Sequence, residues 1–174
     1  MKSRDLSSFS IRKFLTDDAI TITTFVHTLL DNDFRKPYSQ AIITAYKKRF
    51  STAYFLEHIN RDAIYFGAFD GSTLVGIWLG MLEYGGVVFV DWIGVRQEYR
   101  KCGLASLLIR RGEEAIIKAK CHYVYLFTET QENIEFYTKR GFTLVGKHVN
   151  AWFGAQNEYI LGKSLRATPF DESM

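Results

Sequence analysis

Apolar residues along this chain either alternate with polar ones or recur at intervals of three and four positions. Short runs rich in β-branched and aromatic residues, bounded by turn-forming residues, are typical of strands. We therefore predict strands at Phe9–Leu15, Ala63–Phe69, Leu74–Tyr84, Val87–Val95, Tyr123–Thr128, Thr143–Asn150 and Asn157–Leu165. Asp70–Thr73 and Gly85–Gly86 are expected to be turns between neighbouring strands.

Helical spacing of apolar residues predicts helices between several of these strands. We expect Thr16 to cap a helix with Asp17 and Asp18 in its first turn, and Asp31–Asn32–Asp33 to end that helix. A second, longer helix is predicted from Pro37 to about Asn60. Two more are predicted at Leu104–Lys120 and at Gln131–Arg140, the latter stopped by Gly141.

The resulting order, β-α-α-β-β-β-α-β-α-β-β, predicts an α/β (α+β) fold with a mixed, mostly antiparallel sheet flanked by helices. A chain of 174 residues is typical of one domain. We expect a single domain over 1–174, with its core at about 9–165 and a loose tail at 166–174.

Composition narrows the function classes. The chain is 47% apolar and 16% aromatic, which is enough for a sizeable core. Its net charge of +3 is too small to indicate a nucleic-acid surface, and no apolar run reaches the length of about 18 residues that would predict a membrane span. The first residues, MKSRDLSSFSIRK, lack the apolar segment of a secretory signal. Cys102 and Cys121 stand without a disulfide framework, so we expect a cytoplasmic protein.

A metal site is not expected. The four histidines are scattered and form no pair at i,i+4, the spacing that places two ligands on one helix face. They are His27, His58, His122 and His148.

One loop has the pattern of a phosphate site. The strand at Val87–Val95 leads into R-K-C-G-L-A (Arg100–Ala105), where a helix begins. Backbone N–H groups and the positive end of a helix dipole would meet there, beside Arg100 and Lys101, and such a place attracts a phosphate or pyrophosphate. The alternative is an ordinary turn at Gly103 with solvated cations. Neither G-x-x-x-x-G-K-[ST] nor G-x-G-x-x-G occurs, so the common nucleotide motifs are excluded.

Two segments together carry a family resemblance. V-R-Q-E-Y-R-K-C-G-L-A (Val95–Ala105) resembles the Arg/Gln-x-x-Gly-x-Gly/Ala segment of the GNAT superfamily of acetyl-CoA-dependent N-acetyltransferases. N-I-E-F-Y-T-K-R-G-F (Asn133–Phe142) resembles that family's later helix, which ends in F-Y-x-x-x-G-F. Many members carry Asn and a small residue where this chain has Thr130 and Asn133, and the N-x-x-F-Y form is similar to a subgroup that includes puromycin-type antibiotic acetyltransferases.

The resemblance implies roles for particular residues. Arg100 and Lys101 would supply charge, and the pyrophosphate of CoA would be held by the N–H groups of Lys101, Cys102, Gly103, Leu104, Ala105 and Ser106. The backbone of Ile93, Gly94 and Val95 would pair with the pantetheine arm, where two neighbouring strands splay apart, and an N–H near Val95 would stabilise the oxyanion. Asn133 would lie near the arm and Tyr137 near the sulfur.

Tyr137 is a suitable general acid. A phenol with a pKa of about 10 is still protonated at neutral pH and can donate to a leaving thiolate. Asn133 and Tyr137 stand at i,i+4 and so share one helix face. The alternative is a core aromatic residue whose hydroxyl is satisfied within the protein.

Asp91 interrupts a strand that otherwise has the composition of one buried on both faces. By the period of two it would lie on the same face as Ile93 and Val95. Two roles remain open for its carboxylate. It could take a proton from the substrate ammonium through water or hold that cation, or it could be a structural group paired with Tyr or Arg.

By the same resemblance, the loop at Asp31–Tyr38 and the last two strands would border the acceptor pocket. Asp31 and Asp33 belong to that loop. Strand ends and other loops carry further polar and aromatic residues, namely Glu83, Tyr84, Glu129, His148 and Trp152. Each is more often an ordinary surface residue. Asp31, Asp33 and Glu83 could make the pocket attractive to a cation.

The sequence thus predicts an N-acetyltransferase that uses acetyl-CoA as cosubstrate, without a metal, and acetylates a primary amine of a small molecule by direct transfer. Two alternatives remain open: acetylation of a peptide or protein amine, and a non-catalytic CoA-binding sensor. No nucleic-acid or membrane partner is expected, and the residues leave open whether the chain acts alone or as a homodimer.

Overall fold

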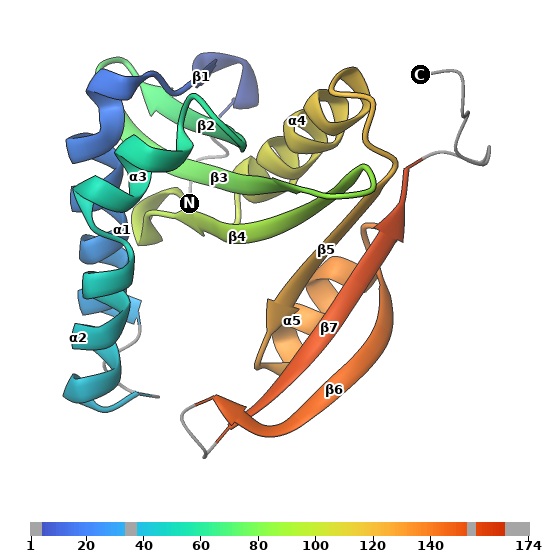
Figure 1. Cartoon of the computed structure of the whole chain (residues 1–174). Coiled ribbons are helices and arrows are strands. Elements are labelled where there is room, and N and C mark those ends of the chain that lie inside the picture. Colours follow the sequence, from blue (N-terminus) through green and yellow to red (C-terminus); the bar gives the residue numbers. More distant parts are fainter. Residues whose placement is uncertain (1–4, 34–37, 153–155, 166–174) are drawn as a thin grey trace. The chain divides into compact units, whose positions relative to one another are not determined.

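The computed structural model describes residues 5–33, 38–152 and 156–165. Its strands form one sheet in the order β1-β2-β3-β4-β5-β7-β6 (Figure 1). They are β1 (Ser10–Lys13), β2 (Ala63–Asp70), β3 (Thr73–Glu83), β4 (Val87–Val95), β5 (Tyr123–Thr128), β6 (Thr143–Trp152) and β7 (Gln156–Ser164). The registered pairs are antiparallel, apart from the parallel pair of β4 with β5. The predicted mixed, mostly antiparallel sheet is therefore confirmed.

Helices occupy the connections. They are α1 (Ala19–Asp33), α2 (Gln40–Arg49), α3 (Thr52–His58), α4 (Leu104–Lys118) and α5 (Gln131–Thr138), with short 3₁₀ turns η1 (Leu6–Ser8), η2 (Thr16–Asp18) and η3 (Gln97–Tyr99). Among the described residues, no helix combines the length and the apolar character that crossing a membrane requires.

Contacts divide the chain into two compact units. The first comprises 1–81 and 92–112, and the second comprises 82–91 and 113–174. The single domain over 1–174 stays a prediction.

The first unit holds β1, β2, most of β3 and the helices α1 to α3, which lie together in Figure 1. Aromatic side chains fill its core: Phe14, Phe55 and Tyr65 are almost fully buried. Phe50 stacks between neighbouring rings and reaches Trp92 of β4, with the ring centroids 5.2 Å apart. This packing anchors the second half of β4 to the helices of the same unit.

One helix prediction is confirmed in this unit and another is wrong. α1 ends at Asp33, within the segment Asp31–Asn32–Asp33 that was expected to end it. Lys47 binds Asp31 at 2.7 Å, so this acid is held by a cation from α2. The single helix from Pro37 to about Asn60 is in fact two, α2 and α3, because Ser51 starts a new helix by accepting a hydrogen bond from the N–H of Tyr54 at 3.3 Å. Pro37 lies outside the described residues.

Thr16 also differs from its predicted role. It lies inside η2 rather than at the cap of a long helix, and α1 begins only at Ala19. Asp18, the last residue of this turn, stabilises its start. The Asp18 carboxylate accepts a hydrogen bond from the N–H of Leu15 at 2.8 Å and binds Arg12 at 2.7 Å. A local acid thus satisfies the N–H of Leu15 at the start of the turn.

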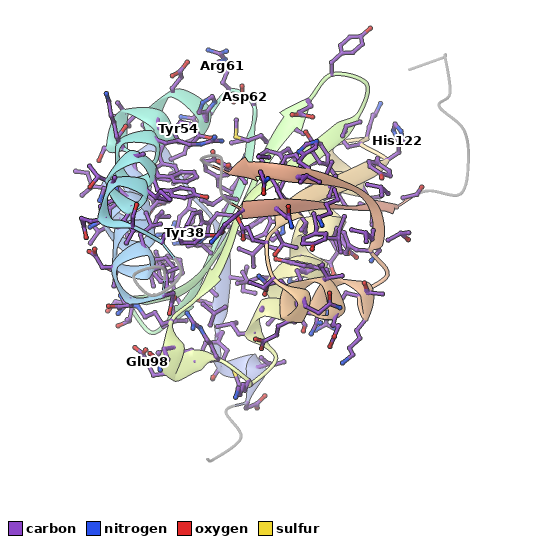
Figure 2. All side chains as sticks on the ribbon, turned by 90° about the horizontal axis from the view of Figure 1, so that it is seen from below. Tyr38, Tyr54, Arg61, Asp62, Glu98 and His122 are labelled. Atoms are coloured by element: carbon purple, nitrogen blue, oxygen red, sulfur yellow. The ribbon has the colours of Figure 1, made fainter. Side chains whose placement is uncertain are left out.

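Polar contacts close the carboxyl end of α3. Tyr54, Arg61 and Asp62 lie near one another there (Figure 2). His58 binds Asp62 at 2.9 Å, and its ring packs on that of Tyr54 with the centroids 4.6 Å apart. These contacts stabilise the turn that leads into β2.

The second unit contains the first half of β4, then β5, β7 and β6, with α5 packed against these strands (Figure 1). Lys163 of β7 binds Glu113 of α4 at 2.7 Å and the carbonyl of Arg140, just after α5, at 2.9 Å. Gly141 follows with a φ of +86°, which ends the helix as the sequence predicted.

Candidate functional site

The predicted phosphate loop has a backbone whose handedness alternates. Lys101 and Gly103 have φ values of +61° and +93°, whereas Arg100 has −76° and Cys102 a negative value. Such alternation turns successive N–H groups toward one side, which makes a concave anion site of the kind called a nest. Glu98, labelled in Figure 2, lies in the turn η3 that precedes the loop.

The helix that follows adds to this concavity. The N–H of Leu107 donates to the carbonyl of Gly103 at 3.0 Å, so the first helical turn begins directly after the loop. Helix geometry gives the N–H groups of Leu104 and Ala105 no acceptor within the helix. The helix is 15 residues long, and the positive end of its dipole lies at the loop. The arrangement suits a pyrophosphate.

The two cations of the loop differ in their surroundings. Arg100 donates through Nε to the carbonyl of Val95 at 2.9 Å and through Nη2 to the carboxylate of Asp33. Lys101 is exposed. Arg100 therefore braces the loop against β4 and α1, whereas the exposed Lys101 remains accessible to a ligand. That both supply charge to a phosphate stays a prediction.

The strand segment expected to pair with pantetheine is Ile93–Val95. The parallel register of β4 with β5 runs from Val87–Tyr123 to Val90–Leu126, and β4 continues beyond it to Val95. A Cβ at Gly94 would lie 2.3 Å from a methyl carbon of Leu29, so any larger residue there would force neighbouring side chains to move. The segment thus lies outside the described register with β5, as a strand that takes up an extended ligand must.

Asn133 and Tyr137 are both on α5. Thr130 caps this helix by accepting from the N–H of Asn133 at 3.2 Å, and the side chain of Asn133 donates to Thr128 of β5 at 3.0 Å. Thr128 is one of the buried polar residues, so this bond fixes the start of the helix against the sheet. The sequence placed Asn133 correctly at the helix start but did not predict this partner.

The ring of Tyr137 packs between Phe136 and Phe142, with centroids 5.1 and 5.6 Å away. Burial of its hydroxyl raises the pKa of Tyr137 above that of an ordinary phenol; the positive charge of Arg140 opposes this shift and the negative charge of Glu129 adds to it. The hydroxyl therefore stays protonated at neutral pH. This is the protonation state that a proton donor needs.

Asp91 is half-buried rather than fully buried. In the first half of β4 the buried residues are the even-numbered Val88 and Val90. Residues 91–94 are half-buried, and the next buried residue is the odd-numbered Val95. Strict alternation is therefore broken, and the expectation that Asp91 shares a face with Val95 by the period of two is wrong. Other groups interact with the Asp91 carboxylate.

Most residues expected around an acceptor have partners. Asp31 and Asp33 bind Lys47 and Arg100, as described above. Glu83 accepts a hydrogen bond from the hydroxyl of Tyr125 at 2.9 Å, and His148 binds Glu158 at 3.2 Å. Tyr84 is fully exposed. The side chain of Trp152 and positions 34–37 of the expected loop lie outside the described residues.

Sequence reasoning missed Tyr125 as a functional candidate. Its hydroxyl meets Glu83, and its ring lies beside Phe89 with the centroids 5.2 Å apart. The available signal was the aromatic alternation Y-V-Y-L-F in β5, which places Tyr123, Tyr125 and Phe127 on one face. No group of three or more potential metal ligands occurs in the part of the chain that the structure describes.

The family described as Acetyltransferase (GNAT) family matches residues 24–142, more than half of the chain. No curated protein matches. Among solved structures, the chain is similar to PaiA N-acetyltransferase from Thermoplasma acidophilum in complex with coenzyme A, at 21% identity and a TM-score of 0.77, over 90% of this chain and 98% of that one.

Two other solved structures are similar at lower identity. The aminoglycoside 6'-N-acetyltransferase from Enterococcus faecium matches at 19% identity and a TM-score of 0.69, covering 92% of this chain and 99% of that one. The ribosomal-protein-S18-alanine N-acetyltransferase from Escherichia coli matches at 13% identity and a TM-score of 0.71, covering 95% and 98%. These similarities show a shared fold.

Proposed function

The chain belongs to the GNAT acetyltransferase family and is an acyl-CoA-dependent acetyltransferase, and we propose that it transfers an acetyl group from acetyl-CoA directly to a primary amine of a small molecule. The observation that carries the cofactor part is the loop at Arg100–Ser106. Its alternating backbone and the start of α4 form an anion site in which Gly103 has a φ of +93°.

Each part of the cosubstrate is assigned to residues of this chain. Lys101 and the loop N–H groups of Cys102, Gly103, Leu104, Ala105 and Ser106 hold the pyrophosphate. The backbone of Ile93, Gly94 and Val95 takes the pantetheine arm, and Asn133 lies near it. Acetyl-CoA supplies an activated acetyl thioester when bound.

Tyr137 is assigned the role of general acid. The amine nitrogen forms a bond to the acetyl carbon, the carbon–sulfur bond breaks, and the departing sulfur takes a proton from the Tyr137 hydroxyl. The phenol recovers its proton from solvent, and the amine loses one, so the products are an amide and a free thiol. Because burial raises the pKa of Tyr137, the hydroxyl remains a donor across the neutral range.

Asp91 is proposed to receive the amine proton through water. Its half-buried position gives the carboxylate access to solvent. The change Asp91→Asn should lower kcat and shift the pH optimum upward, where more of the amine is already neutral. A lower melting temperature with an unchanged pH profile would instead assign Asp91 to structural pairing.

The small-molecule acceptor is supported by the aminoglycoside 6'-N-acetyltransferase among the similar structures. Its test is thiol release from acetyl-CoA over a panel of small primary amines, peptides with free N-termini and lysine peptides. The proposal predicts release with small amines. Release with peptides alone would indicate a peptide acetyltransferase, and CoA binding without release on any acceptor would indicate a sensor.

A further inference from the structure

One face of the sheet in the second unit is aromatic. The register pairs Phe89 of β4 with Tyr125 of β5, so the two side chains lie on the same face. Phe127 follows two positions later on β5 and therefore shares that face. Across the next strands, Phe127 pairs with Ile160 of β7, and His148 of β6 pairs with Glu158. These residues form one continuous surface.

The helices of this unit contact the opposite face. Val124 and Leu126 are buried on that side, and Lys163, the registered partner of Val124, reaches Glu113 of α4 and the carbonyl of Arg140 after α5. The apolar core of the unit thus lies with the helices. Packing against α4 or α5 therefore does not account for the aromatic residues on the other face.

Three rings form a compact triangle on it, named here the aromatic triad: Phe89, Tyr125 and Phe127. Their centroids are 5.2 Å apart for Phe89–Tyr125, 5.4 Å for Phe89–Phe127 and 5.7 Å for Tyr125–Phe127. The planes of the last pair are nearly perpendicular, at 88°. All three side chains are half-buried. Rings at different tilts present both faces and edges to whatever lies above them.

Carboxylates border the triad. Glu83, which is exposed, accepts the Tyr125 hydroxyl at 3.1 and 2.9 Å through its two oxygens. A carboxylate offers about four acceptor positions, so one phenol leaves capacity for a further donor. On the other side, His148 lies 5.9 Å from Phe127 and binds the largely buried Glu158. Negative charge thus stands at the rim of a π surface.

This combination is complementary to an organic cation. An ammonium group is attracted to aromatic faces within about 6 Å, and a carboxylate at the rim can accept its N–H bonds. Burial and the Glu83 charge raise the pKa of Tyr125 to about 12, so the phenol stays neutral at physiological pH. An alkyl chain would pack on the same rings, whereas an anion would be repelled by the Glu83 carboxylate.

We propose that the aromatic triad and Glu83 bind the charged distal group of the acceptor, so that the substrates are cationic di- or polyamines carrying a second ammonium group. The inference rests on the proposed function for the identity of the ligand as acceptor. It adds the substrate class and assigns residues that determine it.

The kinetic test compares two acceptors of equal chain length at pH 8: 1,5-diaminopentane, whose distal nitrogen is charged, and 1-aminopentane, whose distal end is a methyl group. The diamine offers two equivalent amines, so kcat/KM is compared per reactive amine. On that basis wild type should favour the diamine by about two- to thirty-fold, the range expected for a cation on an aromatic surface. Phe127→Leu keeps an apolar side chain but removes the π face, and should bring the preference per reactive amine close to one.

Glu83→Gln should reduce the same preference through KM for the diamine, with KM for acetyl-CoA unchanged. The matched controls are Tyr159→Leu, which removes an aromatic ring on the opposite face, and Glu57→Gln, which removes an exposed carboxylate of α3. Both should keep the preference of wild type. Melting temperatures of all variants report folding.

A binding experiment without acetyl-CoA separates this inference from the proposed function. In an NMR titration with 1,5-diaminopentane, the ring signals of Phe89, Tyr125 and Phe127 should shift, and 1-aminopentane should shift them less. Cation binding without thiol release on any amine would keep the inference and overturn the proposed function. Thiol release with a preference that Phe127→Leu and Glu83→Gln leave unchanged would overturn the inference, and lowered melting temperatures alone would assign the triad to packing.

Discussion

Replacing Gly103 by Asp perturbs the loop that we assign to the pyrophosphate. Its φ of +93° lies in a region that side-chain-bearing residues avoid, whereas the space around it is open: a Cβ there would lie 3.4 Å from a methyl carbon of Leu6, an ordinary contact. The substitution thus strains the backbone without a steric clash. It also adds a negative charge beside Lys101.

The cost to folding follows from that geometry. A left-handed conformation costs an L-residue about 1–2 kcal/mol, which for a chain of this size lowers the melting temperature by about 2–8 °C. Gly71 is a matched control, because its φ is +58° and nothing lies within 4 Å of its Cβ position. Gly71→Asp should cost a similar or smaller amount, since Asp tolerates this conformation better than most residues.

The assay is thermal unfolding with and without CoA. At about 100 times the dissociation constant, CoA should stabilise wild type by about 2.7 kcal/mol, or about 5–10 °C. Gly71→Asp should keep this increment, although its baseline is lower. Gly103→Asp should lose it, because the carboxylate repels the pyrophosphate. An equal increment in all three proteins would refute the assignment of the loop.

Three further predictions address other residues. Tyr137→Phe keeps the ring between Phe136 and Phe142 but removes the proton donor, so kcat should fall by about 10²–10⁴ while KM for acetyl-CoA and the melting temperature stay nearly constant; wild-type turnover would mean that another group protonates the thiolate. Arg100→Ala should lower the melting temperature without ligand, because Arg100 braces Val95 and Asp33. Lys101→Ala should leave the melting temperature unchanged and weaken CoA binding about three- to tenfold. Identical effects of the two substitutions would contradict these separate roles. The pKa of Tyr125 is raised from 10.0 to about 12 in the folded protein, so its stabilising contribution is complete below pH 10 and is lost as pH rises toward 12. Urea unfolding should therefore show that the free energy of unfolding declines less steeply between these pH values for Tyr125→Phe than for wild type. A steeper decline for the variant would contradict the pairing with Glu83.

Local patterns predicted the strands well. β4 and β5 have the bounds expected from their apolar runs, and Gly141 ends α5 as its position after a periodic segment indicated. The break between α2 and α3 was missed because the apolar period continues through Phe50, while the capping hydroxyl of Ser51 is a short, common signal. Periodicity alone does not distinguish one helix from two in succession.

Contacts between distant segments could not be predicted. The sequence marked Arg100 as a phosphate ligand, but its pairing with Asp33 depends on where α1 ends in space. The meeting of Tyr125 with Glu83 likewise depends on strand register. The loop itself was predictable, because its chemistry resides in backbone handedness and in a helix start that adjacent residues determine.

The central claim, direct acetyl transfer to a small primary amine, is tested most directly by following carbon-13 acetyl-CoA by NMR with 1,5-diaminopentane as acceptor. The account predicts that the thioester signal falls as an amide signal rises, in a one-to-one ratio with free CoA thiol. It also predicts that the protein carries no acetyl group during turnover. Thioester that stays intact with every amine while CoA remains bound, or a label that accumulates on the protein before it reaches the amine, would contradict the account.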